Sequence, residues 1–158
     1  MTILLLPSDR SGCGHYRMGN AAALAGDAVR LIWPDSPDLP DVTLAQTIKD
    51  FKLLDEAGCM GIYIDGVWEH WSTHGPMYYL MAQLSWDPKQ DGVAILDDYY
   101  ARGFGPAADS IRKYFEHFEA ARMSYTNKNG YDGGMDNLMA IYTPEMLEIA
   151  EKHLQTAK

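Results

Sequence analysis

Apolar residues gather in three short runs within the first 66 residues of the 158-residue chain. The runs at residues 2–6, 29–33 and 61–64 are continuous, which is typical of strands that are buried on both faces. An alanine-rich stretch lies between the first two runs at residues 20–28, and an amphipathic stretch begins at Thr43. Both stretches predict helices, and Thr43 and Gln46 have the spacing of a capping box. The pattern therefore predicts a β-α-β-α-β unit with parallel strands.

After residue 66 the apolar positions follow helical spacing, and no further strand is evident. Proline and small polar residues favour helix starts, and they predict four helices in this part of the chain. The predicted starts are at Pro76, Asp91, Pro106 and Thr143. Residues 124–137 are rich in Gly and Asn, so we expect a long loop there.

These elements predict an α/β fold with three parallel strands in a β-α-β-α-β unit, followed by an α-helical half. The unit would be partial TIM-barrel-like or Rossmann-like. A whole eight-stranded barrel is excluded because it needs roughly 200 residues. We expect a single domain at residues 1–158, with an α/β part at 1–66 and a mainly helical part at 67–158.

Charge and composition exclude several classes of partner. The chain has 22 acidic and 13 basic residues and a formal net charge of -9, so it repels phosphate groups. We therefore expect neither nucleic acid nor an anionic membrane as a partner. No apolar run approaches the roughly 20 residues of a membrane span, and the start of the chain lacks the basic region of a signal peptide. A cytoplasmic location is expected, and a secreted form that has lost its signal stays open.

The densest group of chemically useful side chains follows the third apolar run. Asp65 comes directly after that run, where the sites of α/β folds collect. Asp65 and Glu69 are candidates for the two carboxyl groups of glycoside hydrolysis. Tryptophan rings stack on sugars and imidazoles hold hydroxyls, so this segment also offers substrate contacts. The candidate contacts are Trp68, His70, Trp71 and His74. A simple Asp65-Gly66 turn, with the tryptophans packed into the core, is the alternative.

A second candidate site lies in the loop after the first apolar run. Gly12 and Gly14 precede a predicted helix, whose backbone amides would cradle a phosphate. Arg17 would add positive charge for the diphosphate of a nucleotide sugar. A tight turn is the alternative, because the full glycine motif is missing.

Other polar groups predict little chemistry. His70 and His74 lack the order of a zinc motif, so neither a metal nor a cofactor is expected. The carboxylate pairs further along the chain are expected to be solvated helix charges. They are Asp97 with Asp98 and Glu116 with Glu119.

Three segments carry a resemblance to a known family. They are residues 38–63 with Gly58-Cys59-Met60-Gly61, residues 79–88 with Trp86-Asp87-Pro88, and residues 98–108 with Phe104-Gly105-Pro106. From about Arg30 to its end the chain resembles a bacterial domain-of-unknown-function family of glycoside-hydrolase-like proteins, whose catalytic unit is an α-glucuronidase-like TIM barrel. The resemblance implies the last barrel strands, the helical region after them and a role in complex-carbohydrate breakdown.

Residues 1–30 resemble a different family. Ile3–Asp9 and Gly12–Arg17 are similar to the opening of phage-type glycosyltransferases.

Half a barrel would leave sheet edges uncovered, so we expect a homo-oligomer. Three functions stay open: a glycoside-hydrolase-like domain, a non-catalytic carbohydrate-binding or structural remnant, and a nucleotide-sugar-binding glycosyltransferase fragment.

Overall fold

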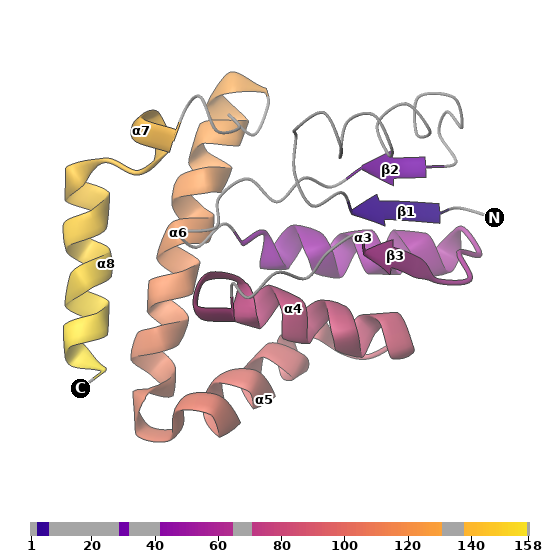
Figure 1. Ribbon diagram of the computed structural model, residues 1–158, viewed down its shortest axis with the longest axis horizontal. Coiled ribbons are helices and arrows are strands. Elements are labelled where there is room, and N and C mark those ends of the chain that lie inside the picture. Colours follow the sequence, from indigo (N-terminus) through magenta and orange to yellow (C-terminus); the bar gives the residue numbers. More distant parts are fainter. Residues whose placement is uncertain (1–2, 7–28, 32–41, 65–70, 131–137, 158) are drawn as a thin grey trace.

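The computed structural model describes residues 3–6, 29–31, 42–64, 71–130 and 138–157. Its three strands are β1 (Ile3–Leu6), β2 (Val29–Leu31) and β3 (Ile62–Ile64). They form one parallel sheet in the order β2-β1-β3, so β1 is central. Leu4 is in register with Arg30 of β2 on one side and with Ile62 of β3 on the other. The sheet lies near the N-terminus, at one end of the molecule (Figure 1).

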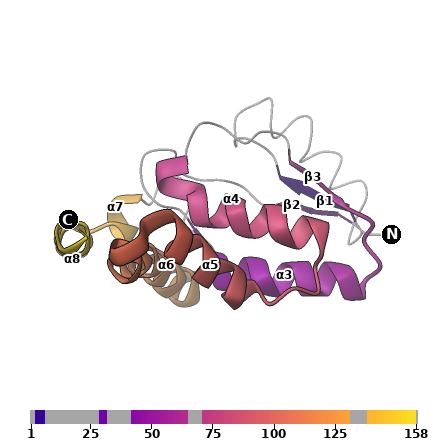
Figure 2. The same cartoon turned by 90° about the horizontal axis from the view of Figure 1, so that it is seen from below.

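Helices make up most of the described chain. They are α3 (Leu44–Glu56), α4 (Trp71–Trp86), α5 (Gly92–Phe104), α6 (Ala108–Asn129), α7 (Leu138–Ile141) and α8 (Pro144–Thr156), with the 3-10 turn η3 (Gly105–Ala107) between α5 and α6. Each long helix packs on the next, α3 on α4, α4 on α5, α5 on α6 and α6 on α8. Figure 2 shows the strands on one side of α3 and α4, with α8 at the far end.

The expected α/β class is therefore wrong, and so is the partial-barrel or Rossmann-like interpretation. The chain is mostly helical, since its three strands have only four, three and three residues. An α/β architecture alternates strands and helices so that the helices cover a sheet. After β3 every described element here is a helix, and these helices bury their apolar faces mainly against one another.

Two apolar cores hold the helices together. The larger core is formed by α3, α4, α5 and the start of α6, and it includes Phe51, Leu80, Leu84, Tyr100 and Phe115. The smaller core joins α6 to the C-terminal helices. It consists of Phe118, Ile141, Tyr142, Met146 and Ala150.

Side chains near the helix N-termini determine where some of the helices begin. Asp91 caps α5 by accepting hydrogen bonds from the backbone N–H groups of Val93 and Ala94, and Thr143 caps α8 by accepting one from Met146. Thr43 does not form the expected capping box, since its side chain makes no capping bond. A tertiary contact takes its place: Glu119 Oε1 of α6 accepts a hydrogen bond from the Ala45 N–H at 2.8 Å. Glu119 is therefore not the freely solvated charge that was expected.

Two helices differ in length from the prediction. Helix α4 begins at Trp71, five residues before the expected start, and contains Pro76 inside it. Its first turns are held by packing, because Thr73, His74 and Gly75 are all buried. Helix α6 continues to Asn129 and ends where Gly130 adopts a left-handed conformation with φ of 76°, so the expected loop begins later than residue 124. The predicted helix at residues 20–28 lies outside the described residues.

Candidate functional site

The sequence-predicted site is described at only two positions. Trp71 and His74 lie in the first turns of α4, where His74 and the following Pro76 are buried. The other site candidates lie outside the described residues, and their roles stay predictions. They are Asp65, Trp68, Glu69 and His70, and in the N-terminal loop Gly12, Gly14 and Arg17.

Trp71 and His74 share one aromatic neighbour but differ in exposure. The Tyr78 ring packs edge-on to Trp71 at 5.2 Å and stacks on His74 at 5.7 Å. Trp71 is 56% exposed, whereas His74 is 2% exposed and its Nδ1 lies 2.8 Å from the Thr73 hydroxyl. Burial also raises the pKa of Tyr78. The Trp71 ring is therefore accessible to a ligand. His74 is buried and contributes to the packing of the first turns of α4.

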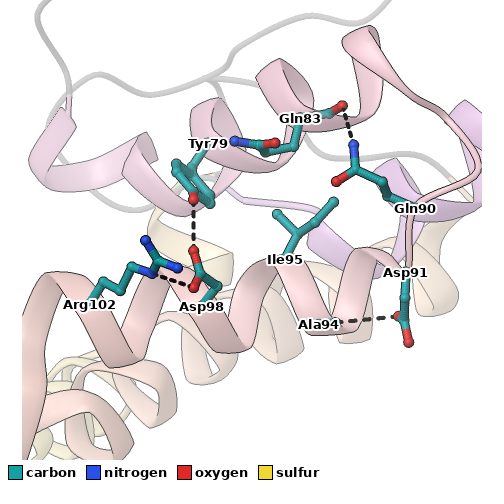
Figure 3. Close-up of a pocket in the computed structure, with 8 residues that line it drawn as sticks. All are labelled: Tyr79, Gln83, Gln90, Asp91, Ala94, Ile95, Asp98 and Arg102. Atoms are coloured by element: carbon teal, nitrogen blue, oxygen red, sulfur yellow. Dashed lines mark hydrogen bonds and ion pairs between the residues drawn. The ribbon is translucent and has the colours of Figure 1, made fainter.

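A groove that the sequence did not predict lies between α4 and α5. Figure 3 shows eight side chains around it, and its volume is about 310 Å³. Ala94 and Ile95 supply its apolar part. The polar lining consists of Tyr79, Gln83, Gln90, Asp91, Asp98 and Arg102.

The polar centre of this α4–α5 groove is Asp98. The Tyr79 hydroxyl donates to Asp98 Oδ2 at 2.9 Å, and Arg102 Nε donates to Asp98 Oδ1 at 2.5 Å. The bond to Asp98 is the main reason why the pKa of Tyr79 is raised, since the neutral phenol is the donor. Asp98 was expected to be an ordinary solvated charge, and it instead joins the two helices.

Gln90 fixes the other end of the groove. Its side-chain amide donates to the backbone carbonyl of Gln83 at 3.0 Å, which holds the turn between α4 and α5 against α4. This bond leaves the Gln90 amide oxygen directed at the same end of the groove (Figure 3). Asp91 is already used as the α5 cap, so its free oxygen is the part that remains for a ligand.

Trp86 follows two of the groove residues along α4 without lining the groove itself. Tyr79, Gln83 and Trp86 are spaced at i, i+4 and i+7, which places them on one face of the helix. Trp86 is 90% exposed, the highest exposure among the large hydrophobic residues in the described part of the chain. This spacing is visible in the sequence, and it is the signal that would have found the face. Asp98 and Arg102 could not be added without knowing how α5 packs.

The fold and the groove define a mainly helical protein with a ligand-sized polar site on its surface. Residues 39–116 match the family model described as "Domain of unknown function (DUF4838)", and this stretch holds α3, α4, α5 and all eight residues that line the groove. The expected resemblance to a domain-of-unknown-function family is thus confirmed over these residues. Its glycoside-hydrolase-like character stays a prediction. The comparisons with curated proteins and with solved structures gave no match.

None of the helices in the described ranges has the length and apolar character that crossing a membrane requires.

Proposed function

We propose that this protein binds a carbohydrate, without hydrolysing it, along the α4–α5 groove and the exposed ring of Trp86. The observation that carries the proposal is the 90% exposure of Trp86 on the same helix face as Tyr79 and Gln83. An indole in water gains much by stacking on the apolar face of a sugar ring, which also leaves the sugar hydroxyls free for polar partners.

The groove beside Trp86 supplies those partners. Sugar hydroxyls both donate and accept hydrogen bonds, and amide side chains do the same. Gln90 offers its amide oxygen at one end of the groove (Figure 3). The Gln83 amide lies at the other end beside Tyr79, where Asp98 and Arg102 offer a carboxylate and a guanidinium. A volume of about 310 Å³ is at the lower end of the range of small-molecule sites, which suits one or two sugar units.

The same groups favour binding over hydrolysis. Glycoside hydrolysis needs two carboxyl groups facing the scissile bond, one of them able to give a proton. The two carboxylates of the groove already accept hydrogen bonds, Asp98 from Tyr79 and Arg102, and Asp91 from the backbone of α5. Neither is held as a proton donor. The exposed Trp86 ring, together with carboxylates that already serve as hydrogen-bond acceptors, supports a binding surface.

The experiment is a binding series with neutral hexose oligosaccharides and uronic-acid-containing oligosaccharides. A thermal-shift screen finds the ligand, because binding to the folded state raises the melting temperature, and calorimetry then gives Kd. Trp86→Ala is expected to weaken binding at least about tenfold, which is the loss of about 1.4 kcal/mol. Trp71→Ala is the matched control, since it removes a second exposed indole from the same helix.

Three results would contradict the proposal. Absence of any shift with every oligosaccharide would remove carbohydrate binding. Loss of binding in Trp71→Ala but not in Trp86→Ala would move the site to the start of α4. Sugar release that disappears in an Asp65→Asn, Glu69→Gln double variant would replace binding by hydrolysis at the sequence-predicted carboxylates.

A further inference from the structure

The rings of His117 and His153 make an edge contact where α6 packs on α8. Their ring centres are 6.1 Å apart, and the rings are inclined by 64°. Both side chains are only partly exposed. Figure 1 shows the two helices lying side by side along most of α8. Two imidazoles on separate helices are thereby brought to a half-buried position.

A hydrogen bond fixes the form of His117. Its Nε2 lies 2.9 Å from the carbonyl oxygen of Met146 in the first turn of α8. Because a carbonyl only accepts, Nε2 carries a hydrogen, so in the neutral form of the ring the lone pair is on Nδ1. Histidines that bind metals commonly donate their other ring nitrogen to a backbone carbonyl in this way. This bond therefore leaves Nδ1 as the nitrogen through which His117 would bind a metal.

The separation of the rings agrees with a shared ion. Metal–imidazole bonds are about 2.0–2.1 Å long, so two rings on one ion have centres roughly 5 Å apart at a tetrahedral angle and roughly 6.5 Å apart on opposite sides of the ion. The observed 6.1 Å lies between these two values. The formal net charge of -9 on the chain favours a cation.

We propose that His117 and His153 bind one late transition-metal ion, such as Zn²⁺ or Cu²⁺, which ties α8 to α6. Imidazole nitrogen suits these ions better than Mg²⁺ or Ca²⁺. No group of three or more metal-binding residues exists within the described ranges, and the residues one turn away on the same faces carry no carboxylate. Two imidazoles therefore supply the protein ligands, and water completes the coordination.

The site would act on the part of the molecule with the smaller core. Helix α8 is held to α6 by the core of Phe118, Met146 and Ala150, with Tyr142 beside it. A bridging ion closes the loop between residues 117 and 153 and adds a cross-link to this contact. Because ligands must be neutral imidazoles, the cross-link is released in acid.

The test uses the full, tag-free chain with Cu²⁺ and Zn²⁺ as probes. Calorimetry with either ion is expected to give one site per chain, and the electron paramagnetic resonance spectrum of the Cu²⁺ form is expected to show nitrogen coupling from two imidazoles. His117→Gln and His153→Gln should each weaken binding at least about tenfold. Glutamine at residue 117 can still donate to the Met146 carbonyl, so the fold is kept. Circular dichroism of the metal-free variants checks this.

His15→Gln and His70→Gln are the matched controls, since each removes one histidine from elsewhere in the sequence. The proposal requires that both retain the affinity of the parent chain and that Zn²⁺ raises the melting temperature of the parent and the controls only. It is overturned if no saturable binding occurs. It is equally overturned if the α6 and α8 variants bind as tightly as the controls, which would make the ion adventitious.

Discussion

Gly75 allows α4 and α5 to approach each other, and its replacement tests the packing beneath the groove. A Cβ added at Gly75 would lie 2.3 Å from the hydroxyl oxygen of Tyr99 and 3.4 Å from its Cζ. The first distance is a clash and the second is an ordinary contact. Tyr99 has little room to move, because its ring contacts those of Tyr79, Tyr100 and Phe104 at 5.4, 5.2 and 5.7 Å.

The two effects of Gly75→Ala differ in sign. Overpacking costs about 1–3 kcal/mol. Alanine in a helix interior gains up to about 1 kcal/mol over glycine, but Pro76 follows directly and reduces this gain. We therefore expect Gly75→Ala to lower the free energy of unfolding by about 1–2 kcal/mol. In a Tyr99→Phe background the clashing oxygen is absent, and the same change should be close to neutral.

Urea unfolding of the four proteins, followed by circular dichroism, completes a double-mutant cycle. The expected coupling free energy between residues 75 and 99 is about 1–2 kcal/mol. An equal cost of Gly75→Ala in both backgrounds would refute the close approach of α4 and α5. Tyr99→Phe by itself serves as the control for the loss of the hydroxyl.

Two further predictions concern buried polar groups. Tyr100 is 1% exposed and no group in the described ranges bonds to its hydroxyl, so Tyr100→Phe should leave the free energy of unfolding unchanged or raise it by about 1 kcal/mol. Tyr142→Phe is the contrast, since it removes the acceptor of the 3.2 Å hydrogen bond from Arg122 Nη2 and should lower the free energy of unfolding. Equal effects of the two changes on urea unfolding would contradict this difference between the two hydroxyl groups. Burial raises the pKa of Glu119, so folding favours the protonated form, and this contribution is lost as the pH rises through the folded-state pKa. The stability of the parent relative to Glu119→Gln should therefore fall as the pH rises above the ordinary glutamate pKa of about 4.3, and a pH-independent difference in urea midpoints would disprove it.

Local signals in the sequence predicted the helix ends that depend on a single side chain. Asp91 and Thr143 cap α5 and α8 where the spacing of polar and apolar residues placed them. The start of α3 at Thr43 was also predicted, but the group that binds its first N–H groups was not, and neither was the start of α4. Glu119, which binds the N-terminus of α3, is 74 residues from Ala45 in the sequence, and the turns of α4 before Pro76 are held by burial.

The predicted α/β class was wrong for a related reason. Short apolar runs are compatible with a buried sheet, but they do not show how much of the chain covers it. Here the residues after β3 form helices that pack on one another, so the sheet is a small part of the fold. The resemblance to a barrel family reinforced the expectation of strands, whereas the matched residues 39–116 are mostly helical in this structure.

The α4–α5 groove depends on tertiary contacts that the spacing of apolar residues in the sequence does not predict. Helix α5 carries Asp98 and Arg102, and two glycines set its position. Gly75 lets Tyr99 of α5 lie against α4, and at Gly92 an added Cβ would lie 2.5 Å from Ile48 of α3. A larger side chain at either position would move α5 away from its neighbour and separate Asp98 from Tyr79. The sequence shows Tyr79, Gln83 and Trp86 on one helix face. It does not show that Gly75 and Gly92 let α5 pack closely enough to bring Asp98 and Arg102 to this face.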